Sequence, residues 1–237
     1  MAILSAAFDS KVRGTMTKDV WEAVDKYFDE MLIPHDPTLD DALAACAAAN
    51  LPAIQVSSVQ GKLLHLLARI MGARNILEIG TLGGYSTIWM ARALPEGGRI
   101  ITLEADPKHA DVARKNFARA GVENKIELRL GKALETLPKV VADGRGPFDM
   151  FFIDANKSNM PEYFEWSLKL ARTGSVIIAD NVVREGAVLD GKSNDADIQG
   201  IRRFLEMVGK EKRVSGTALQ TVSSKNYDGF ALVLVTS

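Results

Sequence analysis

The sequence predicts an α/β fold: a doubly wound, mostly parallel sheet of seven strands that ends in an antiparallel hairpin and is preceded by N-terminal helices. From about residue 74 onward, short apolar or β-branched segments alternate with helical patterns, which is typical of a parallel sheet with helices on both faces. The last two strand-like segments lie too close together in the sequence for a crossover helix, so they must pair as a hairpin. Before residue 74 the pattern is helical.

Each element is expected from its local pattern. The predicted strands span 75–79, 99–103, 125–130, 148–153 and 174–179, followed by the hairpin segments TALQTV (217–222) and GFALVLVT (229–236). The predicted helices span 17–31, 39–50 and 58–71 before the sheet, and 84–93, 107–120, 132–143 and 160–172 between its strands. Asp228-Gly229 are the expected turn residues of the hairpin. We therefore expect a helical extension over residues 1–55 and one α/β domain over residues 56–237.

Composition limits the classes of partner. The chain has 237 residues, 47% of them hydrophobic and 25% charged, with a net charge of −1. This near-neutral charge favours neither nucleic acid nor an anionic membrane as a partner, and no apolar run approaches the ~18 residues of a membrane span. Cys46 is the only cysteine, which indicates a reducing compartment. The N-terminus lacks the pattern of a secretory signal, and its basic residues are only faintly similar to an organellar (mitochondrial) presequence, so we expect a cytoplasmic protein.

A glycine-rich turn, ILEIGTLGGYST (76–87), follows the first predicted strand. It differs from the dinucleotide fingerprint because Leu82 stands where that fingerprint requires a second glycine. Gly80 and Gly84 would let the backbone approach a ligand closely, although the glycines could also serve the turn alone. Glu104 ends the second strand, where an acid accepts hydrogen bonds from ribose hydroxyls. Because Glu78 would repel a pyrophosphate, we expect a ligand that carries a ribose and a cationic group.

The motif E-x-G-x-x-x-G-Y-S followed by L-E-A-D resembles the S-adenosylmethionine-binding core of class I methyltransferases, which have a Rossmann-like fold. More narrowly, the chain from about residue 52 onward is similar to the cation-dependent O-methyltransferases of the caffeoyl-CoA and catechol type. The resemblance implies S-adenosylmethionine as cofactor. It assigns Gly80, Gly84, Tyr85 and Ser86 to the methionine end of the cofactor, Glu104 to the ribose, Ala133 to the adenine and Val56 to a further contact, and Glu78 and Asp154 complete the expected cofactor site.

Polar residues end two other apolar strands, in FFIDANKSN (151–159) and VIIADNVV (176–183). Ligands of open parallel sheets collect at such carboxyl ends. Asp154, Asp180 and Asn181 offer oxygen atoms without a histidine or cysteine, a set that suits a hard cation, Mg²⁺ first, with Mn²⁺ or Ca²⁺ as alternatives. Any one of them alone would be read as a capping or turn residue. The resemblance implies that all three are metal ligands.

Lys157 follows Asp154 by three residues, and the resemblance implies that it is the general base, so Asp154 and Lys157 are the expected catalytic residues. A lysine beside a divalent cation has its charged form disfavoured, which suits this role. The predicted function is a metal-dependent O-methyltransferase that methylates one hydroxyl of a catechol-like vicinal diphenol, such as a phenylpropanoid or flavonoid, and that forms a homodimer. The alternatives are a non-catalytic cofactor-binding or partner-binding protein on the same fold, or a methyltransferase with another small-molecule acceptor.

Two further expectations concern residues outside this set. The three histidines, His35, His65 and His109, are expected to be structural, because none lies near a predicted strand end. The long polar segment 184–197 is expected to act as a specificity lid.

Overall fold

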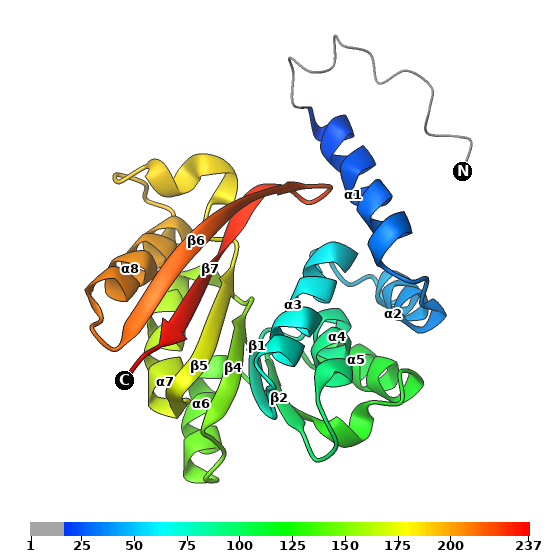
Figure 1. The fold of residues 1–237 in the computed structure, drawn as a ribbon, viewed down its shortest axis with the longest axis horizontal. Coiled ribbons are helices and arrows are strands. Elements are labelled where there is room, and N and C mark those ends of the chain that lie inside the picture. Colours follow the sequence, from blue (N-terminus) through cyan, green and yellow to red (C-terminus); the bar gives the residue numbers. More distant parts are fainter. Residues whose placement is uncertain (1–16) are drawn as a thin grey trace.

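A computed structural model describes residues 17–237 and contains one seven-stranded sheet in the order β3-β2-β1-β4-β5-β7-β6 (Figure 1). The first five strands are parallel, and β7 pairs antiparallel with both β5 and β6. The predicted Rossmann-like α/β fold with a C-terminal hairpin is thus confirmed. The strands are β1 (Asn75–Ile79), β2 (Arg99–Glu104), β3 (Ile126–Leu130), β4 (Phe148–Ile153), β5 (Ala171–Asp180), β6 (Val214–Ser223) and β7 (Asn226–Val235).

Helices cover both faces of the sheet, as Figure 1 shows. Side chains alternate along each strand, so Leu77 of β1 and its register neighbours Ile101 and Phe151 belong to one buried cluster, whereas Ile76 belongs to the other. The first cluster packs against α6 (Ala133–Ala142), α7 (Met160–Leu170) and α8 (Ala196–Lys210). The second packs against α2 (Pro37–Ala48), α3 (Ser58–Ile70), α4 (Tyr85–Ala93) and α5 (Pro107–Arg119). Both faces are therefore buried, as a doubly wound sheet requires.

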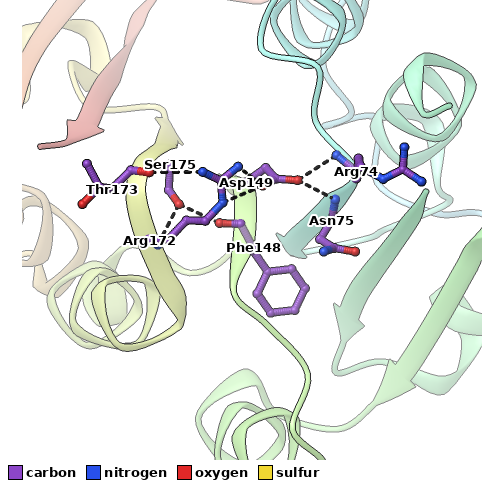
Figure 2. Close-up of polar contacts among 7 residues, drawn as sticks. All are labelled: Arg74, Asn75, Phe148, Asp149, Arg172, Thr173 and Ser175. Carbon is purple, nitrogen blue, oxygen red and sulfur yellow. Dashed lines mark hydrogen bonds and ion pairs between the residues drawn. The ribbon is translucent and has the colours of Figure 1, made fainter. Parts of the chain in front are cut away.

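The amino ends of the central strands are joined by one carboxylate, that of Asp149 (Figure 2). It accepts the backbone N–H groups of Arg74 and Asn75 at 2.7 and 2.9 Å and the guanidinium of Arg172 at 2.6 Å. Burial alone would raise the pKa of Asp149, but these hydrogen bonds hold it below its usual value. Ser175 adds a bond from its hydroxyl to the carbonyl of Phe148. These contacts fix β1, β4 and β5 relative to one another, and so align their carboxyl ends at the opposite edge.

Three features of the C-terminal half differ from the sequence prediction. The prediction that Asp228-Gly229 form the hairpin turn is wrong, because they lie inside β7 and pair with Thr221 and Gln220. The strands continue to Ser223 and Asn226, and the turn falls between those two residues. Helix α8, which is absent from the prediction, begins after the N-cap residue Asp195. Segment 184–197 is not one loop, since it contains the 3-10 segment η4 (Arg184–Leu189) and the start of α8.

The N-terminal helices differ in how they are packed. Leu39 and Ala42 of α2 are buried in the same cluster as α3 and α4, whereas α1 (Lys18–Leu32) has no buried residue. Helix α1 is held by polar contacts instead: Asp25 accepts the backbone N–H of Ser224 at the hairpin turn, and Asp29 accepts the hydroxyl of Ser58. The basic segment considered above as a presequence lies outside the described residues apart from Lys18. Within residues 17–237, no helix is long and apolar enough to span a bilayer.

Candidate active site

A cavity of about 910 Å³ opens at the carboxyl edge of β1, β2 and β4, a volume typical of a site for a small molecule or cofactor. It brings together nine of the predicted residues, which come from six separate parts of the sequence. These are Val56, Gly80, Tyr85, Ser86, Glu104, Ala133, Asp154, Lys157 and Asn181.

The glycines of the turn are required by packing. Gly80 has a φ of 102°, and a Cβ atom there would collide with the carbonyl oxygen of Asp154. Gly84, the N-cap residue of α4, has a φ of 84°, and a Cβ atom there would collide with the ring of Phe117. Both conformations strongly favour glycine. Gly80 lines the cavity, whereas Gly84 contacts α5 and is not among the cavity-lining residues.

Glu104 organises the loop that follows β1. It is 8% exposed, and its carboxylate accepts backbone N–H groups from Thr81, Leu82 and Asp106 at 3.2, 2.7 and 2.9 Å. The ring Nδ1 of His109 lies 3.5 Å from Glu104 Oε1, and His109 also lines the cavity. The expectation that this histidine lies away from the strand ends is therefore wrong. The N-cap at Asp106, which starts a helix that carries His109 in its first turn, is the sequence signal that would have placed it there.

Glu78 lies beneath the turn rather than on the cavity wall. It is 0% exposed and accepts hydroxyl hydrogen bonds from Ser86, Thr87 and Thr102 at 2.6, 2.5 and 2.6 Å. Burial raises the pKa of Glu78 to about 7, although the three hydroxyls lower it. Because Ser86 lines the cavity, any effect of Glu78 on a ligand would act through Ser86 or through its buried charge.

The raised pKa of Glu78 predicts a pH dependence of stability in the absence of ligands. The folded protein keeps this proton up to about pH 7, whereas the unfolded chain loses it near 4.5. The contribution is therefore fully present below pH 4.5 and is lost as the pH rises through 7, by on the order of 3 kcal/mol. Thermal unfolding between pH 5 and 8 should show a smaller fall in Tm for Glu78→Gln than for wild type. The exposed substitution Glu165→Gln is the control, and equal slopes for Glu78→Gln and wild type would contradict the prediction.

The two other strand ends place the predicted metal ligands around Lys157. The Lys157 side-chain Nζ lies 2.9 Å from Asp154 Oδ1, and Lys157 is 5% exposed. Asp180 is 6% exposed, and burial and then the charge of Asp154 raise its pKa to about 7, against the effect of Lys157. Asn181 follows in a left-handed conformation, with a φ of 58°. Two carboxylates thus lie near one lysine, which pairs with Asp154, and this excess of negative charge with oxygen donors fits a hard cation. Among residues 17–237 no group of three or more His, Cys, Asp or Glu side chains could hold a metal, and the Asn181 amide is the further oxygen donor predicted beside Asp154 and Asp180.

A second cavity, of about 740 Å³, adjoins this cluster. Asp180 lines the second cavity, Asp154 and Lys157 line the first, and Asn181 lines both. The hairpin turn contributes Lys225, whose Nζ donates to the carbonyl of Ala53 at 3.0 Å. The cluster therefore lies where the two cavities meet, an arrangement suited to transferring a group between two molecules.

Fold and site together define an α/β transferase with two adjoining ligand cavities at the carboxyl edge of its sheet. The family model described as O-methyltransferase matches residues 30–234, so the chain belongs to the O-methyltransferase family, and the predicted membership is confirmed. It is an enzyme of the class that transfers methyl groups to oxygen.

Curated relatives and solved structures match nearly the whole chain. A catechol O-methyltransferase of Niastella koreensis is 53% identical, over 93% of this chain and 100% of its own length. A catechol O-methyltransferase of Mycobacterium tuberculosis is 52% identical, over 90% of this chain and 94% of its own. The crystal structure of an O-methyltransferase from Bacillus cereus in complex with SAH has a TM-score of 0.92 and 59% identity, and covers 93% of this chain and 100% of its own. That of TomG from Streptomyces achromogenes, involved in tomaymycin synthesis and in complex with SAM, has a TM-score of 0.91 and 50% identity, and covers 94% and 100%.

Proposed function

We propose that the enzyme transfers the methyl group of S-adenosylmethionine to one hydroxyl of a catechol-like vicinal diphenol, such as a phenylpropanoid or flavonoid, with a divalent cation held by Asp154, Asp180 and Asn181. The observation that carries the proposal is the position of Asp154, Lys157, Asp180 and Asn181 where the two cavities meet. The names of the two relatives support a catechol as acceptor, and the SAH and SAM complexes of the two structures support the methyl donor.

The first cavity suits the donor. Its volume is adequate for a nucleoside with an amino-acid tail, and it runs from Ala133 at the start of α6, past Glu104, to the turn at Gly80. We assign Glu104 to the ribose hydroxyls, Ala133 to the adenine, and Gly80, Tyr85 and Ser86 to the methionine end. Lys132 and His109 add basic side chains to the wall of this cavity near Ala133 and Glu104.

Removing the carboxylate of Glu104 should weaken binding of S-adenosylmethionine. A hydrogen bond to a charged group contributes on the order of 1.5–3 kcal/mol, so Glu104→Ala should lower the affinity at least about tenfold. Glu104 also holds the loop at Thr81 and Leu82, so a matched variant that keeps an acceptor oxygen is needed. Glu104→Gln is that variant, and it should bind S-adenosylmethionine with an affinity between those of wild type and Glu104→Ala. Calorimetry that gives wild-type affinity for Glu104→Ala would place the ribose elsewhere.

The residues at the junction account for the chemistry. When bound, the cation supplies a Lewis acid that lowers the pKa of the acceptor hydroxyls. Lys157 takes the proton from the reacting hydroxyl, and the acceptor oxygen attacks the methyl carbon of the donor. The C–O bond forms as the C–S bond breaks, and the sulfonium leaves as a neutral thioether. Since opposite charges cancel in this step, the burial of Lys157 and Asp180, which excludes water, favours it.

A catechol should be methylated much faster than its monohydroxy analogue. Two adjacent hydroxyls can chelate one cation, which both acidifies and orients the reacting oxygen, and a monophenol loses the second contact. We expect kcat/KM to fall by at least about 10²-fold for the monophenol, since orientation alone can contribute several kcal/mol. Mass spectrometry of products formed from labelled S-adenosylmethionine makes the comparison, and similar kcat/KM values for the pair would refute the proposed acceptor class.

We also propose a homodimer, in which the predicted N-terminal extension, residues 1–55, contributes to the interface and to the acceptor site; residues 1–16 of this extension lie outside the described residues. Support comes from α1, where large apolar side chains are exposed on a helix without a buried residue. These are Val24, Tyr27, Phe28, Met31 and Leu32. Light scattering on the full chain at micromolar concentration should give the mass of a dimer.

A further inference from the structure

The turn that follows β5 and leads into η4 has an unfavourable backbone. Asn181, Arg184 and Glu185 have φ values of 58°, 53° and 53°. L-residues rarely adopt this left-handed region, and of these three residues only asparagine is tolerated there moderately well. A segment with three such residues needs support from its surroundings to keep one conformation.

Asp228 of β7 supplies that support. Its Oδ1 atom accepts the backbone N–H groups of Val183 and Arg184, both at 3.0 Å, and that of Gly229 at 2.9 Å. The neighbouring carbonyl of Gly229 accepts the N–H of Val182 at 3.0 Å. Every backbone N–H from Val182 to Arg184 is thus bound by Asp228 or Gly229.

The close contact between β7 and the turn after β5 also requires a glycine at position 229. A Cβ atom at this position would lie 2.7 Å from Cγ2 of Val183 and would collide with the carbonyl oxygen of Leu219. The Asp228-Gly229 pair, which has the composition of a hairpin turn but lies inside a strand, therefore serves the close approach between β7 and the turn after β5.

We infer that Asp228 is a positioning residue for methyl transfer: it clamps residues 182–184 and so holds Asp180 and Asn181 in place at the junction of the two cavities. This inference rests on the proposed function, in which Asp180 and Asn181 bind the cation. Asp228 lines the same cavity as both residues. Residues that orient ligands in this way typically change metal affinity or activity by 10–100-fold when they are removed.

The carboxylate of Asp228 could act in two ways, through its geometry or through its charge. Its Oδ1 atom makes all three hydrogen bonds described above, whereas Oδ2 accepts none from the described part of the chain. Asparagine keeps an oxygen acceptor and removes the charge, so Asp228→Asn separates the two roles and Asp228→Ala removes both. Asp190→Ala is the matched control: Asp190 also accepts a backbone N–H, that of Lys192 at 2.9 Å, in the same segment, but it lies outside both cavities.

Amide hydrogen exchange of residues 181–186, measured without any divalent cation, tests the clamp directly. We expect exchange at Val183 and Arg184 to become at least about tenfold faster in Asp228→Ala and to stay near the wild-type rate in Asp228→Asn and Asp190→Ala. Unchanged exchange in Asp228→Ala would overturn the inference. Hydrogen exchange measured in this way does not depend on the proposed metal. If wild type proves active in EDTA, the metal in the proposed function is refuted, but the exchange experiment still tests the clamp.

Binding and kinetics then test the link to catalysis. In Asp228→Ala, Mn²⁺ affinity measured by calorimetry and kcat/KM for a catechol should each fall about 10–100-fold, with the Kd of S-adenosylmethionine within twofold of wild type. For Asp228→Asn, the Mn²⁺ affinity, the kcat/KM for a catechol and the Kd of S-adenosylmethionine should all stay within about threefold of wild type. If Asp228→Asn and Asp228→Ala lose Mn²⁺ affinity and activity equally, the effect is due to charge and the positioning role is contradicted. The positioning role is also contradicted if exchange becomes faster in Asp228→Ala while Mn²⁺ affinity and activity are unchanged.

Discussion

Replacing Asp154 with alanine is expected to reduce kcat/KM for a catechol by at least about 10³-fold. The substitution removes a proposed metal ligand, and a bound metal contributes several kcal/mol of transition-state stabilisation, where each 1.36 kcal/mol is a factor of ten. It also leaves Lys157, which is 5% exposed and 2.9 Å from Asp154, without its carboxylate partner. Initial rates with saturating S-adenosylmethionine measure the loss of activity, and calorimetry with Mg²⁺ measures the loss of metal affinity.

The surface offers a matched control for Asp154→Ala. Asp111 and Arg114 form an exposed ion pair at 3.1 Å with the same spacing of three residues along the chain. Exposed pairs of this kind contribute little to stability, so Asp111→Ala should keep wild-type activity and Tm. If Asp154→Ala keeps more than a tenth of the wild-type kcat/KM while remaining folded, Asp154 is not a ligand of the catalytic cation.

The second large effect is expected for Lys157→Met, which should lower kcat by about 10²–10⁴-fold, the usual contribution of a general base. The Kd of S-adenosylmethionine should change little, because Lys157 is assigned to the acceptor hydroxyl rather than to the donor. Rapid-mixing experiments in which the first turnover is followed would separate slow chemistry from slow product release.

Lys157→Arg distinguishes a base from a structural counter-charge. Arginine preserves the positive charge beside Asp154 but cannot lose its proton in a protein. If Lys157 is the general base, Lys157→Arg should be nearly as inactive as Lys157→Met. Substantial activity in the arginine variant would instead mean that Lys157 acts by pairing with Asp154.

The strand ends that form the candidate site could be predicted from the sequence because the signal is local. At Asp154 and Asp180, a run of buried apolar residues breaks into polar ones, and parallel strands bring such breaks to one edge. The glycine turn is local as well, since the conformations of Gly80 and Gly84 strongly favour glycine. The fold class follows from the same alternation.

What the sequence did not reveal depends on contacts between distant segments. Helix α8 passes so close to Lys157 that a Cβ atom on Gly200 would collide with the Lys157 carbonyl, and Asp197 accepts the N–H of Ser158 at 2.9 Å. The spacing of Ile198, Ile201 and Phe204 is helical and would have indicated α8, but its approach to the base is a tertiary contact.

Asp228 and Glu78 illustrate the same limit. The turn propensity of Asp-Gly predicts a hairpin tip, yet the pairing of β6 with β7 continues past it, and the carboxylate is used 44 residues away along the chain, at Arg184. Glu78 belongs to the motif that faces the cofactor cavity, but alternation along β1 directs its side chain into the core, where hydroxyls of α4 and β2 surround it. The hydrogen bonds of Asp228 to the turn after β5 and those of Glu78 to hydroxyls of α4 and β2 cannot be predicted from a short window of sequence.

Methyl transfer by metal-stripped wild-type enzyme tests the central claim most directly. The protein is dialysed exhaustively against EDTA and then incubated with labelled S-adenosylmethionine and a catechol, with and without added Mg²⁺, and the methylated product is quantified by mass spectrometry. The proposed role of Asp154, Asp180 and Asn181 predicts at most about a hundredth of the full rate in EDTA and recovery of the full rate on addition of Mg²⁺. Full turnover in EDTA would contradict it.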